Sequence, residues 1–453
     1  MSKISAREVA LTVLCAVENE GAYANLALNR ALGKYRLEKL ERAFATELVY
    51  GALRHRGTVD WVLGGLLKKP LRSHTVLLRN ILRLGAYQLL YLDRVPPSAA
   101  CNEGAEMARR HGHKGAVKLV NGVLRNVARM EREIEYPPME EDPVVHIAVR
   151  YSHPEWLVRD WLERFERERV IAICRANNEA WPVTVRTNAL MLTREELADA
   201  LRKEGLRAAE TVYAPEGLRI EGYGAIDSLA AFRSGWFQVQ DESSMLAARA
   251  LCPEPGARVL DVCSAPGGKT THLAELMGNT GEIIALDLYP HKIALVEENC
   301  RRLRIETVRT MVRDATELPG ELKEWADYLL VDVPCSGLGV LRRRPDARWR
   351  KEPEQMPPLV ELQRRILTGA GACLRPGGVL VYSTCTLNHE ENLGQVRDFL
   401  STHPEFTPED LSPYLPDTLE RIGQGSLQSG HIQILPGEHG LDGFFISRMR
   451  KRK

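Results

Sequence analysis

Two short stretches each place a cysteine among polar residues directly after an apolar run. One is Asp332-Val-Pro-Cys-Ser-Gly-Leu-Gly339 and the other is Ser383-Thr-Cys-Thr-Leu387. An ionised thiol is a strong nucleophile, and a nearby carboxyl group such as that of Asp332 can exchange protons with a bound substrate. Because both cysteines follow predicted strands, we expect Cys335 and Cys385 to meet at one edge of a sheet and to carry nucleophilic chemistry.

The other cysteines give no comparable signal. The sequence has nine in all, and no two have C-x-x-C spacing, so we predict no metal site. An odd number of cysteines without a secretory signal indicates reduced thiols and a cytoplasmic protein. Buried cysteine usually behaves as a small hydrophobic residue, and we interpret six of the remaining ones in this way: Cys15, Cys101, Cys174, Cys252, Cys300 and Cys373.

A glycine-rich turn links a predicted strand to a predicted helix within Val259–Ala274. Such a turn places backbone N–H groups around a ligand at a helix N-terminus. A P-loop would need glycine where Cys263 stands, and the dinucleotide spacing G-x-G-x-x-G is absent. The turn therefore predicts a ligand site that is neither an ATP cradle nor a dinucleotide site. Its residues are Cys263, Ser264, Ala265, Pro266, Gly267, Gly268 and Lys269.

From residue 235 onward, predicted strands alternate with predicted helices. The helices include His291–Leu303 and Leu359–Leu374, the latter closed by Arg375–Gly378. The alternation predicts an α/β domain, a mostly parallel sheet with helices on both faces. Ligands bind beyond the carboxyl ends of such strands, where Asp287, Asp314, Asp332 and Cys385 fall. The predicted strands are Val259–Cys263, Glu282–Asp287, Val308–Arg313, Tyr328–Val333, Val379–Tyr382 and Phe444–Arg448.

The first third of the chain differs from the rest in charge. Residues 1–135 contain 22 Lys and Arg against 13 Asp and Glu, a net of +9, whereas the whole chain has a formal net charge of +1. Apolar residues there recur at helical spacing and predict an all-helical bundle. A basic bundle is typical of a nucleic-acid binder, and a solvated helical surface is the alternative.

Between these parts, residues 144–234 are predicted to form a small α+β unit behind the proline-rich linker Tyr136–Pro143. Thr193 and Glu196 form a capping box for a predicted helix. Two basic segments lie further on. Arg342–Lys351 suits phosphate contact with Trp349 free to stack on a base, or is a solvated loop. The tail from Arg448 is predicted to be a disordered charged end, with contact to RNA as the alternative.

The motifs around the cysteines resemble those of the NOP2/NSUN/Sun family of RNA cytosine-C5 methyltransferases. The similar stretches are Phe237–Ser244, Cys263–Lys269, Asp332–Gly337 and Ser383–Thr386. Ala6–Leu32, Arg42–Leu67 and Leu78–Arg129 resemble the NusB family of RNA-binding helical bundles. Over nearly its full length the chain is similar to the bacterial Sun/Fmu branch of the methyltransferase family. The resemblance implies three domains, namely a NusB-like RNA-binding bundle (1–135), a small RNA-binding or linker domain (144–234) and a Rossmann-like class I methyltransferase domain (235–453).

The resemblance also implies the chemistry. Cofactor S-adenosylmethionine would bind with its methionine end on Cys263–Lys269, its ribose on Asp287 and its adenine edge at Asp314. Asp332 would lie between cofactor and target base and stabilise N3. Cys385 would add to C6 of cytosine, so that C5 becomes nucleophilic enough to take the methyl group, and Cys335 would release the product. The expected substrate is an unpaired or flipped-out cytosine of small-subunit (16S) ribosomal RNA.

Two alternatives remain open from the sequence. The first is a transfer-RNA cytosine methyltransferase with the same catalytic motifs. The second is a non-catalytic RNA-binding or ribosome-assembly factor, although binding alone requires none of Asp332, Cys335 and Cys385. Naked RNA and a precursor of the small ribosomal subunit are both compatible substrates. Nothing demands oligomerisation or a membrane, so a monomer is expected.

Overall fold

The computed structural model describes residues 4–112, 114–416, 418–419 and 426–453. The chain forms two compact units, one of Met1–Glu179 and Leu341–Lys351, the other of Ala180–Val340 and Glu352–Lys453. The short segment Leu341–Lys351 thus belongs to the first unit, although residues of the second flank it on both sides in the sequence.

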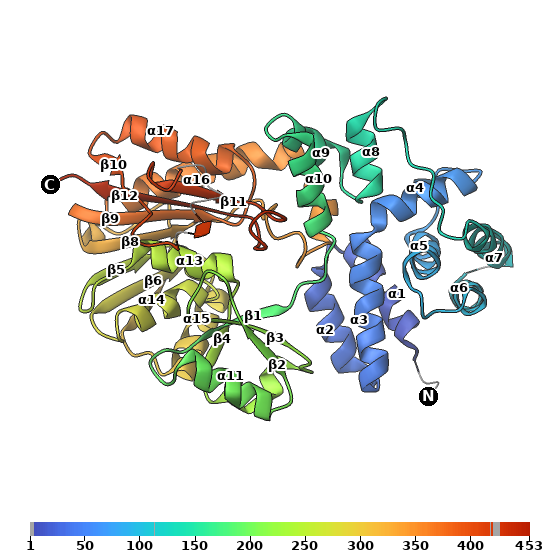
Figure 1. Ribbon diagram of the computed structural model, residues 1–453, viewed down its shortest axis with the longest axis horizontal. Helices are drawn as coiled ribbons and strands as arrows, with labels where there is room; N and C mark the ends of the chain where they lie inside the picture. Colours follow the sequence, from blue (N-terminus) through green and yellow to red (C-terminus); the bar gives the residue numbers. More distant parts are fainter. Residues whose placement is uncertain (1–3, 113, 417, 420–425) are drawn as a thin grey trace. The chain divides into compact units, whose positions relative to one another are not determined.

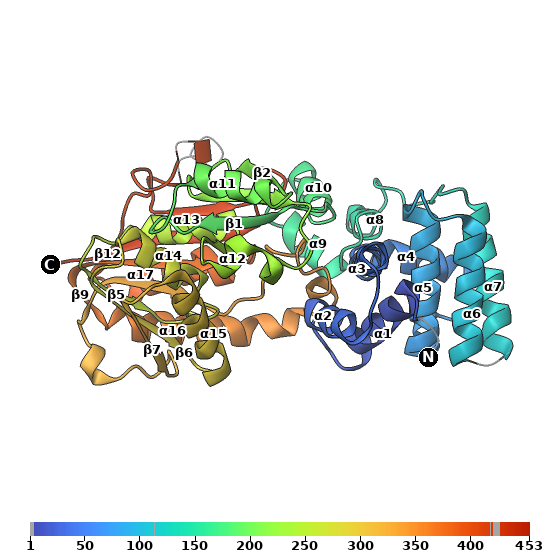
Figure 2. The same cartoon turned by 90° about the horizontal axis from the view of Figure 1, so that it is seen from below.

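Seven helices at the start of the chain form the predicted bundle, with α6 packed beside α7 (Figures 1 and 2). Apolar residues at helical spacing bury one face of each helix, for example Val9, Val13, Leu84 and Val120. Side-chain caps fix helix starts, as where Thr75 accepts a hydrogen bond from the backbone N–H of Leu78. The helices are α1 (Ala6–Asn19), α2 (Ala24–Lys34), α3 (Lys39–Arg54), α4 (Arg56–Leu66), α5 (Val76–Tyr91), α6 (Pro97–His111) and α7 (Lys114–Arg129).

Three shorter helices follow and complete the first unit: α8 (Pro143–Arg150), α9 (Glu155–Leu162) and α10 (Arg167–Ala176). Asp142 caps α8 by accepting a hydrogen bond from the backbone N–H of Val145 at 3.0 Å. We predicted a separate small α+β unit over residues 144–234. These three helices instead belong to the same compact unit as the helical bundle.

The second unit begins with a four-stranded antiparallel sheet in the order β2-β3-β1-β4. Leu197 and Leu201 of α11 bury their side chains against its apolar face. The predicted capping box of α11 is present, with Thr193 and Glu196 each bonded to the other's backbone N–H. The elements are β1 (Val183–Thr187), α11 (Arg194–Lys203), β2 (Arg207–Glu210), β3 (Gly217–Glu221), α12 (Ala230–Arg233) and β4 (Phe237–Val239).

A larger sheet follows in the order β10-β12-β9-β8-β5-β6-β7, with β11 paired to β12. Strands β9, β8, β5, β6 and β7 are parallel, and β12 runs antiparallel to β9. The strands are β5 (Arg258–Asp261), β6 (Glu282–Asp287), β7 (Val308–Val312), β8 (Ala326–Asp332), β9 (Leu374–Thr384), β10 (Phe406–Pro408), β11 (His431–Ile434) and β12 (Phe444–Lys451). The helices are α13 (Glu242–Leu251), α14 (Gly268–Leu276), α15 (Pro290–Leu303), α16 (Met356–Gly371) and α17 (Gln395–Thr402).

Alternating side chains of the large sheet build two separate cores. On β6, Ile283 packs on the side of α13, α14 and α15, while the next residue, Ile284, packs on the side of α16 and α17. The same alternation holds on β9 for Val381 and Tyr382. Helices therefore cover both faces (Figure 1), and the predicted Rossmann-like α/β architecture with a mostly parallel sheet is confirmed.

Two local predictions for the second unit are wrong. Helix α16 ends at Gly371, and Arg375–Gly378, expected as a helix-ending turn, lies within β9. The tail from Arg448 is not a disordered end, because β12 continues to Lys451. The Arg448 side chain is buried and forms an ion pair with Glu409. This ion pair fixes the start of the segment that we expected to be a disordered charged end.

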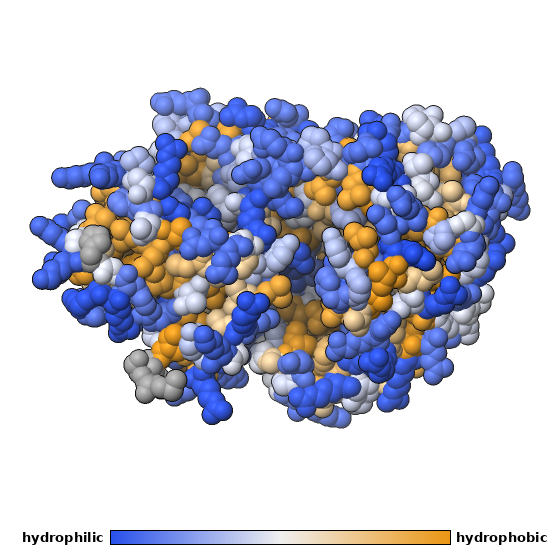
Figure 3. Space-filling view, turned by 180° about the vertical axis from the view of Figure 1, so that it is seen from behind, coloured by the Kyte–Doolittle hydropathy of each residue, from blue (hydrophilic) through white to orange (hydrophobic). Residues whose placement is uncertain are grey.

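Hydrophilic side chains cover much of the face seen in Figure 3, with apolar side chains in patches between them. Within the part of the chain that the structure describes, no helix has the length and apolar character to cross a membrane.

Candidate active site

The two predicted cysteines meet at the carboxyl edge of the large sheet. Strands β8 and β9 are parallel neighbours with Asp332 opposite Ser383, so the loops that follow them leave the sheet side by side. The Sγ atoms of Cys335 and Cys385 are 3.3 Å apart. This is a hydrogen-bond contact between two thiols, far longer than the roughly 2.05 Å of a disulfide bond.

Asp332 lies at the end of β8 with both carboxylate oxygens engaged. Its Oδ1 accepts a hydrogen bond from the Ser383 hydroxyl at 2.8 Å, and its Oδ2 is 2.7 Å from Nζ of Lys269. Lys269 is the second residue of α14, directly after the glycine turn. The ion pair thus joins the predicted cofactor turn to the strand end that precedes Cys335.

Lys269 supplies a permanent positive charge to this site. Desolvation, the largest influence, lowers the pKa of Lys269, but the charge and the hydrogen bond of Asp332 lead the groups that oppose it, and the pKa is raised overall. A negative charge on Cys385 acts in the same direction. Since this attraction is mutual, Lys269 stabilises the thiolate form of Cys385.

Cys335 has a different environment. Its pKa is raised well above the ordinary thiol value, first by its hydrogen bond with Cys385, then by desolvation, and further by negative charge on Cys385 and Glu391. Negative charge on Cys385 and Glu391 therefore favours the neutral thiol form of Cys335.

The glycine turn has the shape that the sequence predicted. Gly267 has φ +99°, and a Cβ there would come within 3.1 Å of the Val296 backbone, so only glycine fits. The backbone N–H of Ser264 donates to the carbonyl of Leu286 at 2.8 Å, which ties the turn to the end of β6. Pro266 and Gly268 complete the entry into α14.

Carboxylates surround the turn. Asp261 ends β5 with Oδ2 bonded to Thr270 at 2.7 Å, and its Oδ1 is buried with no partner among the described residues. Burial, which the hydrogen bond from Thr270 opposes, raises the pKa of Asp261 to about 7. Burial and then the charges of Asp261, Asp332 and Asp287 raise the pKa of Cys263. A cationic ligand at this turn would relieve this repulsion, which fits the sulfonium and ammonium groups of S-adenosylmethionine.

The two remaining predicted acids end the neighbouring strands. Asp287 is buried at the end of β6, with its Oδ1 accepting from the backbone N–H of Tyr289 at 3.2 Å and 3.6 Å from Nζ of Lys292. Asp314 is exposed beyond β7, and hydrogen bonds from the backbone and hydroxyl of Thr316 lower its pKa. Because β6 and β7 are parallel neighbours, both acids lie along the same edge as the turn.

A buried arginine that the sequence did not reveal lies behind the turn. Arg186 of β1 donates to the carbonyl of Gly268 at 2.6 Å and to the hydroxyl of Thr271 at 3.0 Å, and it pairs with Glu275 at 2.7 Å. It thereby fixes the start of α14 from the small antiparallel sheet. No local motif marks Arg186, since even Gln240, the partner nearest in sequence, lies 54 residues away.

Within the basic segment Arg342–Lys351, Arg348 and Trp349 do not have the predicted roles of contacting phosphate and stacking on a base. Arg348 is fully buried in the first unit, and Trp349 donates through Nε1 to the carbonyl of Leu53 at 2.7 Å. The Arg348 guanidinium donates to four oxygens, those of the Arg54, Ser152 and Asn177 carbonyls and of the Asn178 amide. Both side chains hold the helices of the first unit together.

We expect Arg348→Ala to lower the free energy of unfolding of the first unit by about 3 kcal/mol, because several buried acceptors lose their donor. Urea unfolding of the full chain measures this loss. Arg344→Ala is the matched control, because Arg344 is exposed in the same segment and should change the value by less than about 0.5 kcal/mol. Equal midpoints for the two variants would contradict the structural role.

The Cys252 prediction also needs correction. Cys252 is exposed at the end of α13, in the left-handed backbone region, and is not a buried hydrophobic residue. Cys101, Cys174, Cys300 and Cys373 are buried as expected, and Cys15 is half-buried.

The large sheet, the glycine turn after β5 and the acids along its carboxyl edge define a Rossmann-like methyltransferase domain. The model of the family described as 16S rRNA methyltransferase RsmB/F matches residues 248–450. The NusB family model matches residues 4–129, and a ferredoxin-like domain of RsmF/B-like methyltransferases matches 153–227. The chain belongs to the RsmB/F family of 16S ribosomal RNA methyltransferases.

Relatives match over the whole chain. The "Probable ribosomal RNA small subunit methyltransferase B" of Bacillus subtilis is 39% identical over 455 residues, covering 100% of both chains. The "Ribosomal RNA small subunit methyltransferase B" of Vibrio vulnificus is 32% identical and covers 99% of this chain and 100% of its own. Among solved structures, PH0851 matches with a TM-score of 0.82 at 28% identity, covering 99% of each chain. NSun6 from Pyrococcus horikoshii with SFG matches with 0.60 at 28% identity, covering 66% of this chain and 98% of its own.

Proposed function

We propose that the protein methylates C5 of a cytosine in small-subunit (16S) ribosomal RNA through a covalent bond between Cys385 and C6 of the base. The observation that carries the proposal is the pair of thiols 3.3 Å apart beside the Lys269–Asp332 ion pair. Methyl transfer to an already nucleophilic oxygen or nitrogen requires no thiol, whereas C5 of cytosine must first be activated by addition at C6.

The first step falls to Cys385. A free thiol is only a few per cent ionised at neutral pH, and Lys269 favours the ionised form. The Cys385 thiolate adds to C6, and the electron pair of the C5–C6 double bond moves onto C5 and the N3 side of the ring. The Asp332 carboxylate would accept a hydrogen bond from the base edge, and the Lys269 ammonium, which is paired with it, would donate one. These two contacts would hold the base and stabilise the negative charge that develops at N3.

The cofactor fits the residues around the turn. S-adenosylmethionine supplies an electrophilic methyl group when bound. Cys263–Lys269 would hold its methionine end, Asp287 its ribose hydroxyls and Asp314 its adenine edge. Asp287 and Asp314 would present carboxylates to a ligand that carries positive charge and hydroxyl groups. This agrees with the negative charge of the site, where neighbouring carboxylates raise the pKa of Cys263.

Product release is assigned to Cys335. After methylation, the proton on C5 must leave and the Cys385–C6 bond must break, which restores the C5–C6 double bond. Once Cys385 is a thioether, Cys335 no longer faces a neighbouring thiolate and ionises more easily. The Cys335 thiolate then accepts the C5 proton, and Cys385 leaves as a thiolate.

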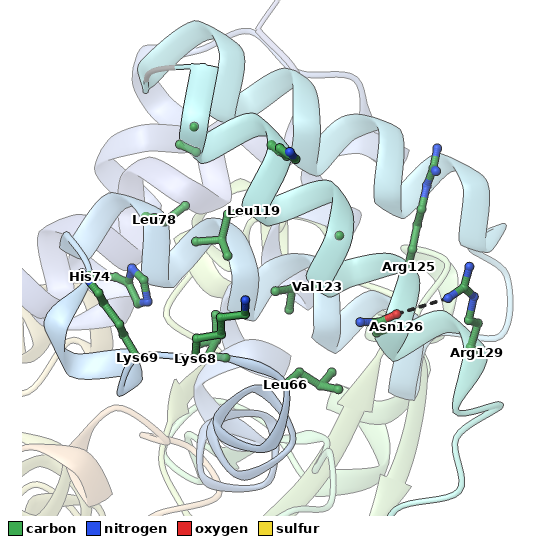
Figure 4. A pocket seen from close by; sticks show the side chains of 15 residues that line it. Leu66, Lys68, Lys69, His74, Leu78, Leu119, Val123, Arg125, Asn126 and Arg129 are labelled. Carbon is green, nitrogen blue, oxygen red and sulfur yellow. Dashed lines mark hydrogen bonds between the residues drawn. The ribbon is translucent and has the colours of Figure 1, made fainter.

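The helical bundle offers a basic pocket for RNA. A pocket of about 770 Å³ opens between the end of α4, the start of α5 and α7 (Figure 4). Leu78, Leu119 and Val123 form part of its apolar wall, and no described residue lining it is acidic. Its cationic residues are Lys68, Lys69, Lys118, Arg125 and Arg129. This local charge supports the interpretation of the basic N-terminal third as an RNA contact.

We expect the double variant K118E/R125E to bind ribosomal RNA about 10-fold more weakly and to reduce the salt slope of binding by about 1–2. Filter binding between 50 and 300 mM salt measures both quantities. Arg30→Glu changes an exposed cation of the same bundle outside the pocket and is the control. An unchanged slope in K118E/R125E would exclude the pocket from the RNA-binding surface.

Labelled methyl transfer to purified RNA tests the function. We expect incorporation into deproteinised small-subunit ribosomal RNA or into its precursor particle. Transfer RNA should not be labelled, and labelling of transfer RNA alone would support the alternative substrate. No labelling of any RNA would favour a binding or assembly factor. We propose that the protein acts in the cytoplasm, where its ribosomal RNA substrate would be, and that it acts as a monomer.

A further inference from the structure

The pocket in the helical bundle combines an apolar floor with a basic rim (Figure 4). The residues of the floor are buried or half-buried, and they are Leu66, Leu78, Ala116, Leu119 and Val123. The residues of the rim are all exposed, and they are Lys68, Lys69, Lys118, Arg125 and Arg129. This arrangement suits a ligand that has a flat apolar part and negative groups beside it.

The positive charge of the rim is not neutralised within the protein. Arg129 donates to the uncharged side-chain amide of Asn126 at 3.3 Å, and the other cations of the rim form no ion pair with a described residue. Arginines elsewhere in the bundle are paired, as Arg83 is with Glu18 and Asp60. Unpaired cations around one cavity favour a polyanion as its ligand.

A glycine leaves one wall of the pocket bare. Gly122 lies in the middle of α7 and lines the pocket. A Cβ atom placed there would meet no described atom of another element within 4 Å, so packing does not require glycine. Glycine is less favourable than alanine in a helix interior, because its backbone loses more conformational freedom on folding. The missing side chain lets a flat ring approach the helix closely.

We propose that the pocket takes one unstacked base of single-stranded RNA. The base lies against α7 at Gly122 and on the apolar floor, and the phosphates on either side of it contact the basic rim. An RNA duplex fits these features poorly, because its bases stay stacked on one another. The inference rests on RNA being the substrate in the proposed function, and it adds that the bundle binds a base as well as phosphates.

Photocrosslinking of the full-length protein locates the base. The probe is a single strand of about ten 4-thiouridine nucleotides, which crosslinks through its bases, and peptide mass spectrometry maps the sites. We expect crosslinks in the peptides that contain residues 66–78 and 116–129. No crosslink in these peptides, whether or not others form, would overturn the proposal and leave the pocket to a partner of another class.

Gly122→Ala should reduce the yield of the pocket crosslinks about 3-fold, because the added methyl group holds the base away from the helix. The midpoint of urea unfolding should stay equal or rise, since alanine favours the helix. Gly33→Ala makes the same change at an exposed glycine of α2 outside the pocket, and we expect it to leave the yield unchanged. Equal yields in the two variants would contradict the close approach at Gly122.

Gly122→Leu is the stronger variant, because its side chain occupies the space of the base. We expect the pocket crosslinks to fall at least about 10-fold. An unchanged yield in Gly122→Leu would overturn the proposal whatever Gly122→Ala does. Pocket crosslinks without methyl transfer to ribosomal RNA would instead contradict the proposed function and leave the base-binding site in place.

Discussion

Cys385→Ala should reduce methyl transfer on the order of 10⁴-fold or more, because the proposed reaction has no route to an activated C5 without addition at C6. The Cys385 side chain lies in a loop fixed from both sides, by the hydrogen bonds of Thr386 and by the end of β9. Truncating one thiol there should leave the fold intact. Labelled methyl incorporation into ribosomal RNA under single-turnover conditions measures the loss.

Cofactor binding separates a chemical defect from a structural one. We expect Cys385→Ala to bind S-adenosylmethionine within about threefold of the unmodified protein, since its loop follows β9 and the cofactor turn follows β5. Cys252→Ala, at an exposed thiol on α13, controls for loss of a reactive cysteine elsewhere and should keep full activity. More than a tenth of normal activity in Cys385→Ala would contradict its role as nucleophile.

Cys335→Ala should have the opposite signature, which is accumulation of a covalent protein–RNA complex. Addition and methylation need only Cys385, whereas loss of the C5 proton needs a base at the position of the Cys335 sulfur, 3.3 Å from that of Cys385. We expect turnover to fall more than about 100-fold, while a band containing RNA persists through denaturing electrophoresis. The band should require S-adenosylmethionine and should disappear after protease treatment.

The double variant C335A/C385A is the matched control for that complex. It should give no shifted band, because the remaining structure has no sulfur at either position. A band of equal intensity in the double variant would place the RNA on another residue. A band that appears in Cys385→Ala instead would show that the roles of the two cysteines are exchanged.

Much of the catalytic sheet was predictable because its signals are local. Each predicted strand of the large sheet is present within a few residues, since an apolar run bounded by polar turns specifies a strand. Cys335 and Cys385 could be brought together from the sequence because parallel neighbours release their loops at one edge. The Lys269–Asp332 ion pair joins two residues that had been predicted separately.

What the sequence did not reveal depends on contacts between distant segments. Arg348 looks like a phosphate-binding residue in a basic run, yet it is buried among carbonyl oxygens of helices that precede it by about 170 to 290 residues. Arg186 supports the site from β1, which carries no recognised motif. A charged side chain is placed by its partners, and the partners of these two arginines become visible only in the folded chain.

The identity of the methylated nucleoside tests the account most directly. Small-subunit ribosomal RNA from cells with and without the protein would be digested to nucleosides and separated by liquid chromatography with mass spectrometry. We predict one 5-methylcytidine per RNA that disappears without the protein and returns with the unmodified protein but not with Cys385→Ala. A protein-dependent methyl group on N4 of cytosine, on a ribose 2′-oxygen or on another base would contradict the thiol mechanism.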